Sequence, residues 1–125
     1  DASALAKLVL REAETAALAA SIARLDRLVT SIVGVIELAR AARRSLGEPG
    51  VRAAELVAAG LTVISVTPAV AARARVLGPA ELRTLDAIHL ATALEMGGEL
   101  PFCCYDRRLA DAATGVGLRV VHPGA

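Results

Sequence analysis

The sequence is poor in aromatic side chains. Among its 125 residues there is no Trp, and Phe102 and Tyr105 are the only Phe and Tyr. Proteins that hold single-stranded nucleic acids by base stacking need several exposed aromatic rings, so this mode of binding is not expected. Because 55% of the residues are hydrophobic, Ala, Val, Leu and Ile must provide the core packing.

Cysteine and lysine are also scarce. Cys103 and Cys104 are neighbours and would point to opposite faces of a strand, which excludes a disulfide between them. Two such thiols are too few for a zinc site, and we interpret them as small buried groups in a protein of the reducing cytoplasm. Lys7 is the only Lys, so the remaining basic residues are Arg. Arginine suits phosphate binding, although a GC-rich coding bias would produce the same composition.

Neither a strong net charge nor a long apolar run is present. Fourteen basic and thirteen acidic residues give a net charge of +1, which excludes a strongly basic nucleic-acid coat protein and an acidic tail protein. Apolar runs such as residues 61–66 are short, so neither a membrane span nor a signal peptide is expected. The length fits a single domain over residues 1–125.

Short β-branched segments alternate with helical ones along the chain. Strands that are apolar on both faces and alternate with helices are typical of an α/β fold with a parallel sheet. Ser31 and Thr84 are expected to cap helices, and residues 47–50 to form a loop. The predicted strands are 28–30, 61–66, 100–105 and 118–121, and the predicted helices are 3–25 in two parts, 31–44, 51–59, 68–77, 84–96 and 106–115 or 106–117. A strand is also expected ahead of the first helix, so we expect it to be missing or truncated before Asp1.

Four acidic residues occupy positions where a carboxylate suggests chemistry. Asp106 follows a predicted strand, Asp1 would end the expected first strand, and Asp86 lies in the first turn of a predicted helix. Glu37 lies inside the apolar segment 32–39. Ligands of open parallel sheets bind beyond the carboxyl ends of the strands. Carboxylates gathered there would repel each other unless a cation lay among them, and an oxygen-only set favours Mg²⁺ or Mn²⁺.

Each of these acids also has a purely structural interpretation. Asp1 and Asp106 could be helix N-caps, and Asp86 could complement a helix dipole. Glu37 could pair with Arg40 one turn along the same helix. The residues alone leave both interpretations open.

Four segments resemble the motifs of PIN-domain ribonucleases, in particular the VapC-type toxins. Asp1–Leu8 resembles the opening motif of that family, with Asp1 as its acid. The second, third and fourth motifs are matched in the same order along the chain, which puts Glu37, Asp86 and Asp106 at the acid positions. The matching segments are Ser31–Ala41, Leu82–Ala93 and Tyr105–Ala110. The third match is the most specific of the four.

The resemblance implies a three-layer α/β/α fold with a central, mostly parallel sheet. It also implies a Mg²⁺-dependent endoribonuclease, with Mn²⁺ as a possible substitute, that forms a homodimer and is neutralised by a VapB-type antitoxin. Asp1, Glu37, Asp86 and Asp106 would be its catalytic and metal-binding residues. Ser3 matches a hydroxyl position of the family and could orient a water or a ligand, or simply cap a helix.

Several other polar residues near the four acids are weaker candidates for a functional role. Arg83, Arg107 and Arg108 lie near the acids in the sequence and are candidates for binding RNA phosphates. His89 follows Asp86 by three residues, but its apolar surroundings favour a satisfied core histidine. Asp111 is a weak candidate for a fifth acid.

Three other functions are alternatives to the ribonuclease. A receiver domain would need a Lys opposite the acids, and a haloacid-dehalogenase-type phosphatase would need an Asp where Ser3 stands. The remaining alternative is a catalytically silent PIN-like scaffold that binds protein or RNA.

Overall fold

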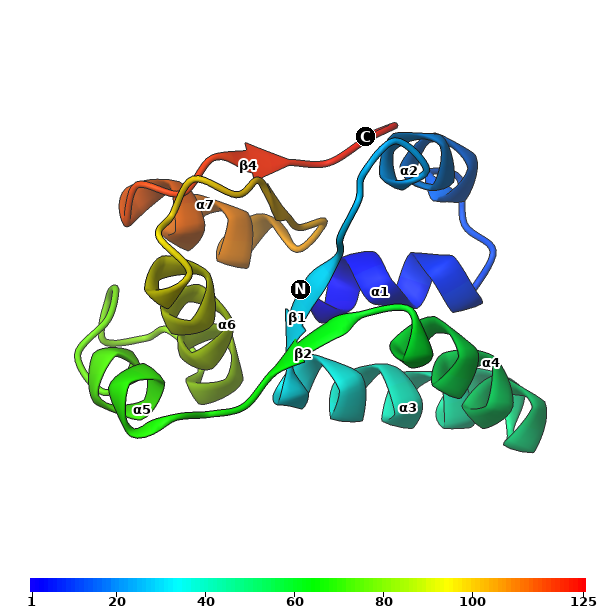
Figure 1. Ribbon diagram of the computed structural model, residues 1–125, viewed down its shortest axis with the longest axis horizontal. Coiled ribbons are helices and arrows are strands. Elements are labelled where there is room, and N and C mark those ends of the chain that lie inside the picture. Colours follow the sequence, from blue (N-terminus) through cyan, green and yellow to red (C-terminus); the bar gives the residue numbers. More distant parts are fainter.

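The computed structural model describes residues 1–125 as seven helices and four short strands (Figure 1). The predicted alternation is confirmed, although each strand after the first is shorter than expected. In chain order the elements are α1 (Ala2–Val9), α2 (Thr15–Ile22), β1 (Val29–Ser31), α3 (Ile32–Leu46), α4 (Glu48–Ala59), β2 (Thr62–Ile64), α5 (Pro68–Ala74), α6 (Thr84–Glu95), β3 (Phe102–Cys103), α7 (Arg107–Gly115) and β4 (Val120–Val121).

The strands form two separate parallel pairs. β1 pairs with β2, with Val29 opposite Thr62, and β3 pairs with β4, with Phe102 opposite Val120. A mostly apolar cavity of about 230 Å³ is lined by residues of both pairs and of α1, α2 and α6. The predicted parallel strands and covering helices are therefore confirmed, with the sheet in two parts. A strand ahead of Asp1 concerns residues outside the printed sequence and stays a prediction.

Small and branched aliphatic residues make up most of the core. One cluster packs α1, α3 and α4 together, and it consists of Leu5, Leu38, Ala42 and Ala54. A second packs α6 and α7 against the β3–β4 side, and it consists of Leu90, Phe102, Cys104, Leu109, Ala113 and Leu118. Figure 1 shows α3 and α4 side by side, with α1 next to α3.

The predicted loop at residues 47–50 is wrong. Gly47 alone separates α3 from α4, with a φ of 64°, and α4 begins at Glu48. Pro49 fits the first turn of a helix because its missing N–H has no helical partner there. Gly50 is buried, and a Cβ at this position would lie 2.3 Å from the carbonyl oxygen of Ala42. The glycine thus permits the close approach of α4 to α3.

One of the two predicted helix caps is confirmed. The Ser31 hydroxyl accepts a hydrogen bond from the amide of Val33 and caps α3. Thr84, by contrast, lies inside α6, because Arg83 is the last residue with extended backbone angles. No helix has the length and apolar character that crossing a bilayer requires.

Candidate active site

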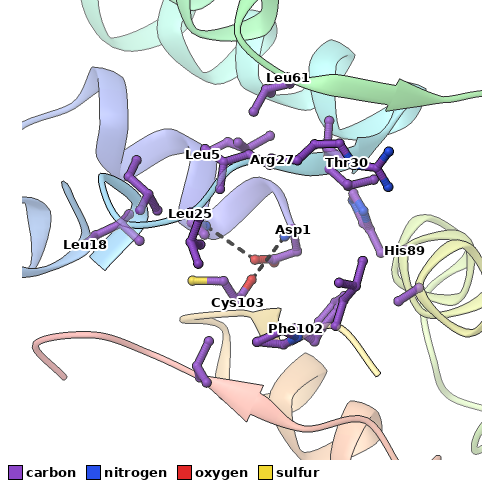
Figure 2. Close-up of a pocket in the computed structure, with 18 of the residues that line it drawn as sticks. Asp1, Leu5, Leu18, Leu25, Arg27, Thr30, Leu61, His89, Phe102 and Cys103 are labelled. Atoms are coloured by element: carbon purple, nitrogen blue, oxygen red, sulfur yellow. Dashed lines mark hydrogen bonds between the residues drawn. The ribbon is translucent and has the colours of Figure 1, made fainter. Parts of the chain in front are cut away.

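Asp1 begins α1, and its carboxylate is already hydrogen-bonded. Its two oxygens accept from the amides of Ser3 and Ala4, each at 3.3 Å, and from the Ser3 hydroxyl at 2.8 Å. The backbone nitrogen of Asp1 donates to the carbonyl oxygen of Cys103 at 3.0 Å, a contact drawn in Figure 2. The helix-cap interpretation of Asp1 is therefore confirmed. A carboxylate with about four acceptor sites still has capacity for a further ligand.

Asp106, like Asp1, caps a helix and still has capacity for a further ligand. It is the N-cap of α7, and one carboxylate oxygen accepts from the amide of Leu109 at 3.0 Å. The residue is exposed, directly after the segment that leaves β3. Its second carboxylate oxygen makes no hydrogen bond within the chain.

The surroundings of Asp86 disfavour its charged form. It lies in the first turn of α6 and is partly buried, and no salt bridge pairs it with a cation. Burial raises the pKa of its carboxyl, and the nearby charges of Asp106 and, more weakly, Glu37 raise it further. His89 and Arg83 act in the opposite direction without cancelling the shift. Asp106 and Glu37 thus both lie within electrostatic range of Asp86.

Glu37 projects from α3 and does not pair with Arg40. Its Oε1 atom lies 2.6 Å from Nε2 of His89, which belongs to α6. The expectation that His89 is a satisfied core histidine is correct as far as burial goes, since the residue is 5% exposed. Its partner is a candidate site acid, which the sequence did not indicate. Figure 2 shows His89 and Thr30 at one end of the cavity, away from Leu18 and Leu25.

The four acids do not form a finished coordination sphere. No three Asp, Glu, His or Cys side chains lie close enough together to ligate one ion. The donor chemistry nonetheless fits a hard divalent cation, since all four groups are carboxylates and Asp86 is crowded by two of the others.

Arginine lies beside these acids. A pocket of about 90 Å³ is lined by Asp86 together with Arg83 and Arg108, and Glu81 also contributes to its wall. Arg107 is exposed but does not line this pocket. Of the four candidate acids, Asp86 alone lines this pocket, and Asp1 lines the larger apolar cavity.

Ser3 connects the two ends of the site. Its hydroxyl donates to the Asp1 carboxylate and accepts from the amide of Tyr105, both at 2.8 Å. The Ser3 hydroxyl therefore does more than cap a helix, because one of its two partners lies in a distant segment of the chain. The structure therefore ties the start of α1 to the segment that carries Asp106.

The chain matches known proteins along its length. The family model of the PIN domain matches residues 1–115. The chain is 40% identical over 131 aligned positions to "Ribonuclease VapC47" of Mycobacterium tuberculosis, covering all of this chain and 96% of that protein. It is 40% identical to "Ribonuclease VapC46" (98% of this chain, 95% of that protein) and 37% identical to "Ribonuclease VapC35" (99% and 95%), both also from M. tuberculosis. The chain therefore belongs to the PIN-domain family, in its VapC-type branch.

Proposed function

We propose that this protein is a metal-dependent endoribonuclease toxin that hydrolyses phosphodiester bonds of structured RNA. The observation that carries the proposal is the environment of Asp86. Burial and the charges of Asp106 and Glu37 all disfavour the ionised form of its carboxyl. Maintaining ionised acids in such surroundings costs stability, and a bound cation would remove that cost. The three relatives are named as ribonucleases, which supports ribonuclease chemistry.

Asp1, Glu37, Asp86 and Asp106 are the residues that would hold Mg²⁺, with Mn²⁺ as a substitute. The cation supplies positive charge to the transferring phosphoryl group and makes a water molecule more acidic. The chain's own contribution is to hold the carboxylates in place. The hydrogen bonds of Asp1 and Asp106 to the first turns of α1 and α7 restrict both side chains.

Arg83 and Arg108 would bind a phosphate of the RNA next to the scissile bond. Both line the pocket that contains Asp86, and a guanidinium can donate two parallel hydrogen bonds to a phosphate. Arg107 would contact the backbone further away, because it lies outside that pocket. With so few aromatic rings, substrate choice would depend on RNA shape and phosphate positions.

A VapB-type antitoxin is the proposed protein partner, and the toxin itself is proposed to be a homodimer. An Arg of the antitoxin could enter the acidic site and bridge two of its carboxylates, which would block the cation. A complex that retains full ribonuclease activity, with the site open in its structure, would contradict this mode of inhibition.

The activity can be tested with the purified full chain and total RNA, in Mg²⁺ and in EDTA, followed by mapping of the product ends. We expect cleavage in Mg²⁺ that leaves 5′-phosphate and 3′-hydroxyl ends, and no cleavage in EDTA. Equal cleavage in both buffers would contradict the metal dependence. RNA binding without any cleavage would instead favour the silent scaffold.

A further inference from the structure

His89 and Glu37 form a contact between α6 and α3 across 52 residues of sequence. The two ends of this contact differ in burial: the His89 side chain is 4% exposed, whereas that of Glu37 is 31% exposed. The imidazole is therefore the fixed partner, and the carboxylate extends from it toward solvent. An ionised carboxylate can only accept, so Nε2 of His89 donates the hydrogen bond.

The local sequence makes room for this contact. Gly34 lies one turn before Glu37 on α3, and a Cβ at position 34 would lie 3.2 Å from Cε1 of His89 and 2.4 Å from Oγ1 of Thr30. The glycine thus lets the imidazole ring lie against α3. On the facing helix, His89 follows Asp86 by three residues, which places both on the same side of α6. Two pairs with the same spacing, Gly34 with Glu37 and Asp86 with His89, face each other at the site.

We propose that His89 is a positioning residue that holds Glu37 in its cation-binding orientation. With Oε1 occupied by the imidazole N–H, the rotation of the carboxylate is restricted and Oε2 remains available. Hydrogen bonds of this kind to a ligating group commonly change metal affinity or activity about 10- to 100-fold. The inference rests on the proposed function, because it assigns Glu37 to the cation site.

Two variants of similar shape separate the hydrogen bond from the packing. His89→Gln keeps an N–H donor at a similar reach, and His89→Met fills a similar volume without a donor. Mn²⁺ binding is measured by electron paramagnetic resonance at a temperature at which circular dichroism shows each variant to be folded. We expect His89→Met to weaken Mn²⁺ binding about 10- to 100-fold and His89→Gln to remain within a few-fold of the unmodified protein.

A control and a double variant complete the test. Thr92→Val changes another buried polar residue of α6 that bonds only to its own helix, and it should leave Mn²⁺ affinity unchanged. In a Glu37→Gln background, His89→Met should have little further effect, because the carboxylate that His89 would position has already been removed.

The outcomes distinguish the two proposals. If the unmodified protein binds no Mn²⁺, the proposed function is overturned and this inference falls with it. If it binds Mn²⁺ and His89→Met binds equally well, or if the effects of His89→Met and Glu37→Gln are additive, only the positioning role is overturned.

Discussion

Two groups of carboxylates in this protein have opposite electrostatic surroundings. Near the end of α1, Glu12 and Glu14 both contact the ammonium group of Lys7, which is buried and also lies 4.7 Å from the ring centroid of Tyr105. The contacts with the two acids raise the pKa of Lys7, and the contact with Lys7 lowers the pKa of Glu14. Here the charged forms stabilise the fold.

Asp86 and Asp106 of the candidate site have no such partner, and Glu37 contacts only the imidazole of His89. Burial and neighbouring acids raise the pKa of Asp86, and Asp106 and Glu37 face it from other elements of the fold. The only lysine of the chain is committed to the other group. The comparison shows that Lys7 compensates the charges of Glu12 and Glu14, whereas the charge of Asp86 is not compensated by a salt bridge.

The largest expected effect is on catalysis. Asp86→Asn should reduce RNA cleavage in Mg²⁺ by about 10³-fold, because it removes a charged ligand and the charge stabilisation it provides. Glu12→Gln, in the paired group, should leave the cleavage rate unchanged. Rates are measured with a labelled RNA under single-turnover conditions. Similar losses in the two variants would remove the distinction between the groups.

The second effect tests the packing beside the site. Gly34→Ala should lower the free energy of unfolding by about 1–3 kcal/mol, because the added methyl group overlaps Thr30 and approaches His89. Gly115→Ala is the matched control, since a Cβ there meets nothing within 4 Å. Urea denaturation of both variants gives the comparison. Equal stability of the two would show that α3 can move away from α6 at little cost.

A smaller effect on stability is expected for Lys7 and its partners Glu12 and Glu14. Lys7→Met should lower the melting temperature by several degrees at pH 7, because two acids lose their cation. The raised pKa of Lys7 means that its contribution is complete below its unfolded value of about 10.4 and is lost at higher pH. The lowered pKa of Glu14 means that its contribution is lost as the pH falls below about 4. A difference between variant and unmodified protein that persisted unchanged at pH 3 would contradict the ion-pair explanation.

The smallest expected effect is the pH dependence of stability that Asp86 causes. Because the folded-state pKa of Asp86 is raised, the folded protein binds more protons than the unfolded chain above pH 4, and stability should rise as the pH falls from 7 toward 5. Asp86→Asn should melt slightly higher than the unmodified protein at pH 7 and lose part of this pH dependence. Mg²⁺ should raise the melting temperature of the unmodified protein more than that of the variant.

Asp111→Asn is the control for this series, because Asp111 is exposed and is not among the residues that shift the pKa of Asp86. Thermal melts in EDTA and in Mg²⁺ at pH 5, 6 and 7 test the expectation. A lower melting temperature for Asp86→Asn in EDTA, with no response of either protein to Mg²⁺, would identify Asp86 as a structural residue.

The sequence predicts the local features of this molecule better than its long-range contacts. Ser31 and Asp106 are recognisable as caps because a short polar side chain at a helix start bonds amides two or three residues ahead. The start of α4 was missed, because Gly47, Pro49 and Gly50 look like loop residues while two of them fit a tightly packed helix. The four candidate acids are assigned from their resemblance to family motifs, and their role in a site stays a prediction.

The contact of Glu37 with His89 could not be predicted in the same way. It depends on how α3 and α6 pack across 52 residues, and a histidine among apolar residues indicates burial without naming its partner. Arg40 was the more obvious partner for Glu37, because an i, i+3 pair needs no tertiary structure. Tertiary packing selected His89 instead.

The Ser3 hydroxyl has a consequence for the dynamics of the protein. Because one oxygen atom bonds both the Asp1 side chain and the Tyr105 amide, segments separated by 102 residues in sequence share one hydrogen-bond network. The Tyr105 amide should therefore exchange its hydrogen with solvent slowly, although it lies just outside β3. In Ser3→Ala that exchange should accelerate, so Tyr105 offers a spectroscopic reporter on whether the two halves of the acid group move together.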